Sequence, residues 1–178
     1  MMTRASWLIL ALAVLAAAAG GWLQRRSAQL HGDGAALLGQ PAPELTLPDL
    51  DGRPHRLADY RGRRVLLNLW ASWCAPCLKE MPALAAAQAK FGDRGAIVLG
   101  IGMDEPARAR AFLAAHPVGY PILLGRLEPP DTATALGDAD GVLPYSVLLD
   151  ADGRVRAARR GTLDAATLER WLAPEPKP

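Results

Sequence analysis

Two cysteines carry the most distinctive chemistry of this 178-residue chain, and they are its only two. Cys74 and Cys77 follow the apolar run 65–70 and open a segment whose apolar residues recur with helical spacing. In the first turn of a helix, two intervening residues bring both sulfur atoms within bonding distance. Such a pair exchanges disulfides, because one thiolate attacks and the second thiol resolves the mixed disulfide. The spacing therefore predicts a redox-active dithiol.

The place of the pair at a helix start predicts different roles for its two members. Free backbone N–H groups and the helix dipole stabilise negative charge there. Cys74, at the exposed start, is therefore the expected attacking thiolate, and Cys77, deeper in the helix, is the expected resolving thiol. Ala75 and Pro76 form the turn between them, and proline fits the first helical turn because its missing N–H costs little there. No cofactor is expected beyond the redox-active disulfide Cys74–Cys77.

Other uses of a cysteine pair fit the sequence less well. A structural zinc site usually takes four ligands, and the three histidines, at 31, 55 and 116, stand at no ligand spacing; no metal site is expected. Haem attachment needs histidine directly after the second cysteine, where the chain has Leu78. A structural disulfide across two residues closes too small a loop to stabilise a fold much. Ala71 disfavours a peroxidase, whose signature has threonine at this position.

Strand and helix patterns alternate around the cysteines. Alternation of this kind predicts an α/β fold with a mixed sheet and helices on both faces. Strands are predicted at 44–47, 55–57, 65–70, 96–101, 120–124, 147–150 and 155–158. Helices are predicted at 74–91, between Asp104 and Pro117, before Leu136 and after Asp164.

The N-terminal 24 residues predict export or membrane anchoring. Arg4 precedes an uncharged run, 5–24, which Arg25 and Arg26 end. Twenty residues as a helix span about 30 Å, about the hydrocarbon thickness of a bilayer. Tryptophans near both ends of the run favour an anchor, whereas the small residues at 17–19 also fit cleavage of a signal peptide. Both alternatives stay open.

Composition divides the chain into four parts, and its charge balance limits the possible partners. The predicted parts are an anchor or signal peptide at 1–24, a tether at 25–40, a folded domain at 41–173 and a flexible tail at 174–178. The chain has 20 basic and 18 acidic residues, and without Arg4 the balance is 19 to 18, or +1. Such a small charge excludes an electrostatic footprint for nucleic acid.

The segment around the cysteines resembles a known family. Residues 67–82, Leu-Asn-Leu-Trp-Ala-Ser-Trp-Cys-Ala-Pro-Cys-Leu-Lys-Glu-Met-Pro, are similar to the active-site segment of thioredoxin-like proteins of the TlpA/ResA type. The resemblance covers about 40–172 and implies a thioredoxin fold with an N-terminal extension and a central insertion near 103–136. It also implies a single-pass anchor in the bacterial inner membrane with a periplasmic domain, or a soluble periplasmic protein if the leader is cleaved.

The resemblance implies a substrate site beside the cysteines. Pro144, within Gly141-Val142-Leu143-Pro144-Tyr145-Ser146, matches the position of a cis-proline that faces the disulfide in this family. The backbone of Leu143 would then pair with an extended peptide of the substrate. Tyr145 departs from the family, which often has threonine there. We also expect Trp73 to shield the disulfide and to contact the substrate.

A further expectation concerns proton transfer. Asn68 occupies the position where cytosolic thioredoxins carry a buried acid, and a neutral amide cannot accept a proton from Cys77. Glu80, one helical turn after Cys77, is a candidate for this transfer and for tuning the thiol pKa. The alternative places Glu80 on a solvated helix face.

The sequence leaves the direction of electron flow open. The resemblance favours a reductase that keeps partner thiols reduced for haem attachment in cytochrome c biogenesis or for copper-site assembly, with apocytochrome c as one expected partner. Such a reductase needs a membrane electron donor of the DsbD/CcdA type. The alternatives are a disulfide oxidase or isomerase of exported proteins and a Cu(I)-handling module.

Overall fold

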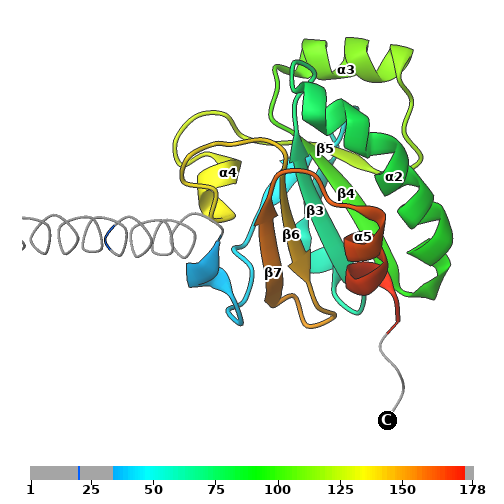
Figure 1. Cartoon of the computed structure of the whole chain (residues 1–178). Coiled ribbons are helices and arrows are strands. Elements are labelled where there is room, and N and C mark those ends of the chain that lie inside the picture. The colour runs from blue at the N-terminus through cyan, green and yellow to red at the C-terminus, as the bar shows by residue number, and fades with distance from the viewer. Residues whose placement is uncertain (1–19, 21–33, 175–178) are drawn as a thin grey trace, which may run out of the picture.

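A computed structural model describes residue 20 and residues 34–174 of the chain. Within 34–174, the strands form a five-stranded sheet of order β5-β4-β3-β6-β7 and a two-stranded sheet, β1-β2 (Figure 1). The predicted anchor lies outside the described residues except for Gly20, as do most of the tether and of the tail. None of the helices described is both long and apolar enough to cross a membrane.

The central strands of the sheet are apolar and buried on both faces. β3 (Arg64–Trp70) lies parallel to β4 (Ala96–Gly102), which lies parallel to β5 (Ile122–Leu124). β6 (Tyr145–Leu149) and β7 (Val155–Arg160) complete the sheet with antiparallel pairing. Nearly continuous burial along β3, β4 and β6 matches their unbroken apolar runs. The predicted mixed sheet is therefore confirmed.

Three helices cover one face of this sheet. A single core cluster joins strand side chains on this face to residues of α2 (Ala75–Phe91), α3 (Pro106–Ala115) and α5 (Ala165–Leu172). α5 begins at Asp164, whose carboxylate accepts the Thr167 N–H at 2.7 Å, as the sequence predicts. Figure 1 shows α2 and α5 next to one another, and an ion pair of 2.6 Å between Lys90 and Glu169 joins them.

The N-terminal extension covers the opposite face. It contains η1 (Ala35–Leu37), β1 (Thr46–Pro48), β2 (Pro54–Arg56) and η2 (Leu57–Tyr60). Apolar side chains of this extension pack on the sheet in a second core cluster, together with α4 (Thr132–Ala135). The prediction of helices on both faces is only partly met. The three long helices all lie on one face, and a hairpin with short helical turns buries the other.

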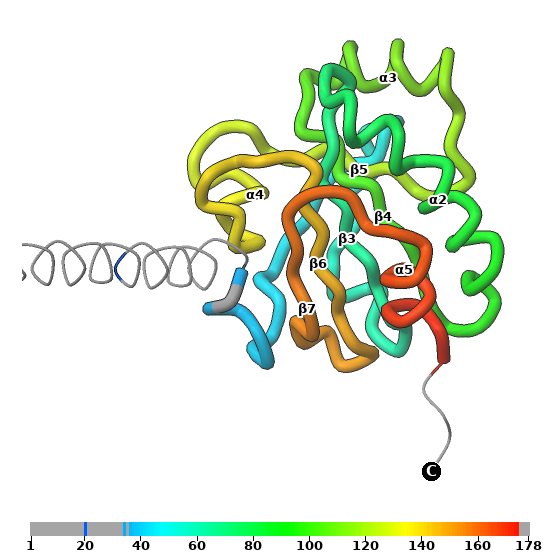
Figure 2. Tube along the Cα trace, in the orientation of Figure 1, coloured from blue at the N-terminus to red at the C-terminus, as the bar shows by residue number. Residues whose placement is uncertain are grey.

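Several element boundaries differ from the predictions. The β1–β2 hairpin pairs Thr46 with Arg56, so each strand is shifted by one or two residues from its predicted range. β6 starts two residues earlier than predicted, because Tyr145 and Ser146 already pair with β3. The chain between β5 and β6 makes a wide excursion that carries α4 (Figure 2). This excursion overlaps the region where the resemblance implies an insertion.

A hydrogen-bond network around His55 fixes the hairpin. Its Nδ1 lies 3.1 Å from the Tyr60 hydroxyl, and its Nε2 lies 3.1 Å from Oδ2 of Asp49. Asp49 also accepts the backbone N–H of Arg53 at 2.9 Å and forms a bridge to Leu123 at the sheet edge. Polar contacts therefore link the two ends of the hairpin and join it to β5.

Burial of the extension predicts its importance for stability. Leu47 of β1 is buried in the second core cluster, so Leu47→Ala is expected to lower the free energy of unfolding by about 2–5 kcal/mol. Leu38, which is 46% exposed, is the matched control, and Leu38→Ala should change it by less than about 0.5 kcal/mol. Urea unfolding of the oxidised protein measures both. If Leu47→Ala lowers the free energy of unfolding as little as Leu38→Ala does, the extension is not part of the cooperative core.

Candidate active site

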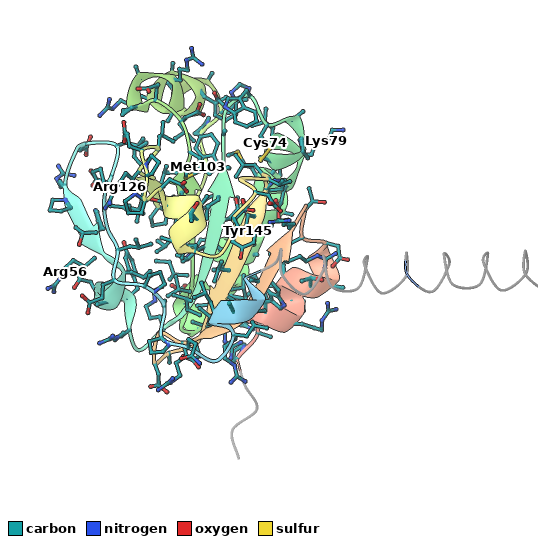
Figure 3. The ribbon with its side chains drawn as sticks, turned by 90° about the vertical axis from the view of Figure 1, so that its left-hand side faces the viewer. Arg56, Cys74, Lys79, Met103, Arg126 and Tyr145 are labelled. Atoms are coloured by element: carbon teal, nitrogen blue, oxygen red, sulfur yellow. A yellow bond between two sulfur atoms is a disulfide. The ribbon has the colours of Figure 1, made fainter. Side chains whose placement is uncertain are left out.

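The two cysteines lie where β3 ends and α2 begins. They form a disulfide, with their Cα atoms 5.3 Å apart. Cys74 is the N-cap of α2, and its Sγ accepts the backbone N–H of Cys77 at 3.3 Å. The N–H of Cys74 donates to the carbonyl of Ala71 at 3.1 Å, which closes the turn before the helix. The structure thus places both sulfur atoms in one helical turn at one end of the sheet, where Figure 3 labels Cys74.

Both cysteines are more enclosed than the sequence suggests. Cys74 is 4% exposed and Cys77 is 1% exposed, although Ala75 and Pro76 between them are exposed. The expectation of Cys74 at an exposed helix start is therefore wrong for the oxidised form. The cause is its cap conformation, which directs Sγ toward the first turn and the Cys77 sulfur rather than toward solvent.

An open groove, which we call the disulfide groove, is lined by Trp73, the residue directly before Cys74, whereas neither cysteine itself lines it. It has a volume of about 320 Å³, and Trp73, which is 67% exposed, forms one side of it. Leu143 lines the same groove, and the peptide bond between Leu143 and Pro144 is cis. Pro144 itself does not line the groove, and its carbonyl accepts the N–H of Gly161 at 2.9 Å. The structure therefore brings Trp73 and Leu143 together in one groove, and Leu143 also packs against the core cluster that contains both cysteines.

Glu80 lies inside the protein rather than on a solvated face. It is 3% exposed, and its Oε1 accepts the backbone N–H of Leu163 at 2.8 Å. Its Oε2 is buried and has no hydrogen-bond partner among residues 34–174. Burial raises the pKa of Glu80, while the Leu163 N–H, the nearby Asn68 amide and Arg159 act in the opposite direction. The carboxyl group is thus set up to hold or release a proton one helical turn after Cys77.

Asn68 sits in a polar row that crosses the sheet beneath α2. Its amide donates to the hydroxyl of Ser146 at 3.0 Å, and both side chains are buried. The strand register aligns Asn68 with Gly100 on one side and with Ser146 on the other, and Ser146 with Arg159. The helix side of the sheet therefore carries polar groups in the layer that Glu80 approaches.

Asp104 stabilises the turn before the cysteines, a role that was not predicted from the sequence. It was expected only as part of a helix start, but Glu105 is the N-cap of α3. Instead, the buried Asp104 carboxylate accepts the backbone N–H of Ser72. The signal that could have found it is the parallel pairing of β3 and β4, since the carboxyl ends of neighbouring parallel strands meet at one edge of a sheet.

Tyr145 lies away from the disulfide groove. It is fully buried in the core cluster of the opposite face, and its hydroxyl donates to the carbonyl of Leu136 at 3.1 Å. Proteins of the TlpA/ResA type often have threonine at this position. In this chain the tyrosine instead binds the C-terminal end of α4 through its hydroxyl.

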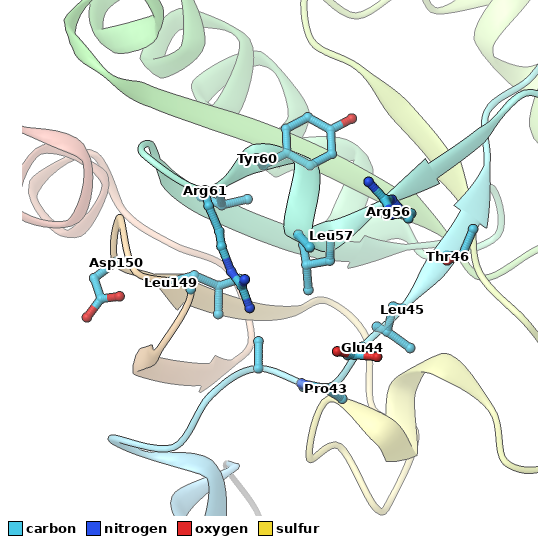
Figure 4. Close-up of a pocket in the computed structure, with 14 residues that line it drawn as sticks. Pro43, Glu44, Leu45, Thr46, Arg56, Leu57, Tyr60, Arg61, Leu149 and Asp150 are labelled. Carbon is cyan, nitrogen blue, oxygen red and sulfur yellow. The ribbon is translucent and has the colours of Figure 1, made fainter.

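A second pocket lies against the N-terminal extension. It has a volume of about 150 Å³ and lies between the chain before β1, the η2 turn and the end of β6 (Figure 4). Figure 4 shows the Arg61 side chain extending beside Leu149 toward the segment that holds Glu44. Its lining includes no cysteine and no histidine, so it offers no thiol or imidazole chemistry.

The fold and the disulfide at the start of α2 define a thioredoxin-like thiol-disulfide oxidoreductase. The chain belongs to the AhpC/TSA family, whose model matches residues 38–158. Among curated proteins, it is 33% identical over 139 residues to "Thiol-disulfide oxidoreductase ResA" of Geobacillus thermodenitrificans, covering 78% of each chain. It is 31% identical over 139 residues to "Thioredoxin-like protein YneN" of Bacillus subtilis, covering 75% of this chain and 78% of the relative.

Solved structures show the same architecture. A putative thiol:disulfide interchange protein DsbE from Chlorobium tepidum superimposes with a TM-score of 0.67 at 31% identity, covering 75% of this chain and 94% of the other. A secreted thiol-disulfide isomerase from Corynebacterium glutamicum gives a TM-score of 0.66 at 27% identity, covering 75% and 83%. The predicted thioredoxin-like fold and the resemblance to ResA-type proteins are confirmed.

The buried carboxyl group predicts a specific pH dependence of stability. Because burial raises the pKa of Glu80 above its ordinary value of 4.5, the folded protein binds this proton more tightly than the unfolded chain does. The contribution of Glu80 to stability is therefore fully present below pH 4.5 and should be lost as pH rises through the raised folded value. Glutamine does not titrate, so Glu80→Gln should gain stability relative to wild type across that window and show a constant difference above it.

Urea unfolding of the oxidised proteins at a series of pH values measures this difference. Glu128→Gln, at an exposed loop position, is the control, and the difference in stability between this variant and wild type should stay constant with pH. If the difference between wild type and Glu80→Gln stays constant with pH, the Glu80 pKa is not raised in the folded state.

Proposed function

We propose that this protein is a membrane-anchored, periplasm-facing reductase of disulfides in exported proteins. The observation that carries the proposal is the placement of Cys74 as the cap of α2, directly after the exposed Trp73, which lines a groove together with Leu143. A partner protein that enters this groove would contact Trp73, the residue directly before Cys74, and curated relatives bear names of thiol-disulfide oxidoreductases.

The proposed reaction transfers two electrons from the dithiol to the partner. The Cys74 thiolate attacks one sulfur of the partner disulfide, forms a mixed disulfide and releases the other partner sulfur as a thiolate that takes up a proton. Cys77 then loses its proton and attacks Sγ of Cys74, which releases the second partner thiol. The partner gains two electrons and two protons in total, and Cys74 and Cys77 end as a disulfide.

Glu80 is the proposed acceptor of the Cys77 proton. Its position three residues after Cys77 places both side chains on neighbouring turns of one helix face, and its raised pKa favours the protonated form at the moment of transfer. Asn68 and the Leu163 N–H then stabilise the carboxylate when the proton leaves again.

The proposed substrates follow from the resemblance to TlpA/ResA-type proteins. They are apocytochrome c, before haem attachment, or proteins whose copper site has a cysteine pair. Trp73 and the backbone of Leu143 would contact the segment around the partner cysteine, with Pro144 fixing the chain direction at the groove. Such a reductase has to be reduced again, and a membrane donor of the DsbD/CcdA type is proposed for this step.

The proposed location rests on the N-terminal sequence. Residues 1–24 would serve as the single-pass anchor, with 25–40 as tether, 41–173 as periplasmic domain and 174–178 as a flexible tail. The folded part begins before the predicted bound at residue 41, because Leu37 packs against the second core cluster, and Gly39 and Ala42 donate hydrogen bonds to Val155 and Gly153 in the β6–β7 hairpin. The tether would therefore leave the domain beside this hairpin.

A mixed-disulfide trap tests the assignment of the two cysteines. Cys77→Ser removes the resolving thiol, so Cys74 should accumulate as a mixed disulfide with a Cys-x-x-Cys-His peptide supplied in its disulfide form. Cys74→Ser is the matched control and should trap the peptide at least about tenfold more slowly. Mass spectrometry without reductant measures both products. Equal trapping by the two variants would reverse the assigned roles.

The reduction potential tests the direction of electron flow. A reductase is expected to be clearly more reducing than DsbA, whose potential is about −120 mV. Equilibration of the full chain in glutathione buffers, followed by alkylation of free thiols, gives the value. A potential close to that of DsbA would favour the oxidase alternative and contradict the proposed reductase.

A further inference from the structure

One wall of the disulfide groove is a loop without regular secondary structure. After α4 the chain passes through residues 136–144 before it enters β6, and Asp138, Asp140, Gly141 and Leu143 of this loop line the same groove as Trp73. A loop of this kind holds one shape only if other parts of the protein hold it. Its contacts therefore decide how the groove presents Leu143 to a partner.

Arg160, the last residue of β7, binds this loop at two points. Its Nε and Nη2 lie 3.2 and 3.1 Å from Oδ1 of Asp138, and its Nη1 lies 2.7 Å from Oδ2 of Asp140. The Asp138 side chain is fully buried, whereas that of Asp140 is 64% exposed. One guanidinium thus links two carboxylates that are two residues apart and places them against the edge strand of the sheet.

The chemistry of this contact is specific to arginine. A guanidinium offers several N–H donors in a rigid plane and stays charged at all relevant pH values, whereas a lysine ammonium is a point charge on a flexible chain. Burial raises the pKa of Asp138, and the charge of Arg160 opposes that effect. Without Arg160, the loop would retain a buried carboxyl group without its cation and a second carboxylate at the groove.

The neighbouring contacts join the same loop to the same two strands. The Tyr145 hydroxyl holds the carbonyl of Leu136 at the start of the loop, and the N–H of Gly161 donates to the carbonyl of Pro144 at its end. The β6–β7 register pairs Tyr145 with Arg160. Arg160 therefore holds the middle of a loop whose two ends are already fixed.

We propose that Arg160 is a positioning residue for substrate binding: it holds residues 138–143 as the wall of the disulfide groove through Asp138 and Asp140 and does not itself contact the reacting sulfur atoms. This inference rests on the proposed function, because it assumes that a disulfide-bearing protein segment occupies the groove. A small disulfide that needs only the cysteines does not depend on this wall.

The test compares the activity of each variant toward two substrates, a disulfide-bearing peptide and a small-molecule disulfide. The reduced full chain is assayed with the disulfide form of a Cys-x-x-Cys-His peptide and with 5,5′-dithiobis(2-nitrobenzoate). Arg160→Met is expected to raise KM for the peptide about tenfold, with kcat and the rate toward the small disulfide within about twofold of wild type. Arg160→Lys should rescue part of the loss, and Arg156→Met, at an exposed arginine of the same strand, should behave as wild type.

A binding measurement separates this inference from the proposed function. The dissociation constant of the same peptide with both cysteines replaced by serine should rise about tenfold in Arg160→Met. A rise in this constant without peptide turnover by wild type supports the positioning role and contradicts the proposed function. Turnover by wild type with KM and dissociation constant unchanged in Arg160→Met overturns the positioning role and leaves the proposed function standing.

Two further results guard against a general effect on folding. If Arg160→Met does not fold, Asp140→Asn tests the exposed half of the contact and should raise KM for the peptide in the same direction by a smaller factor. A parallel loss of activity toward the peptide and the small disulfide in a folded variant would place the effect at the cysteines and overturn the proposal.

Discussion

The first turn of α2 is the constraint on which the rest of the structure depends, because it holds two sulfur atoms within bonding distance. Its geometry is secured from both sides. The carbonyl of Ala71 accepts the Cys74 N–H, the Asp104 carboxylate accepts the Ser72 N–H, and the carbonyl of Trp70 accepts the N–H of Met103. The ends of β3 and β4 therefore act as one rigid base, from which the helix starts at a fixed place and angle.

Features set by local sequence could be predicted, and features set by distant contacts could not. The place of Cys74 at a strand–helix junction follows from an apolar run and a helical repeat, and Asp164 caps α5 as predicted. Ser72 and Asp104 lie 32 positions apart, and Arg160 and Asp138 lie 22 apart. No pattern along the chain joins such pairs before the strand order is known.

The burial of Glu80 shows the same limit in a single residue. Helical periodicity left open whether its side chain faces solvent or the core. What decides the matter is the segment before α5, whose Leu163 N–H donates to the carboxylate from 83 positions away. The thioredoxin-like fold, by contrast, could be inferred from the sequence, because the order of strands and helices and the active-site segment agree on it.

The location of the buried acid has a mechanical consequence. In this chain the acid is part of the same helix as the cysteines, while the strand position beneath them holds the neutral Asn68. If a docking protein tilts or shifts α2 as a rigid body, Cys77 and Glu80 travel together and keep their separation. An acid on the sheet would not follow the same motion, so the proton transfer proposed between Cys77 and Glu80 would tolerate helix displacement that would separate Cys77 from an acid on the strand.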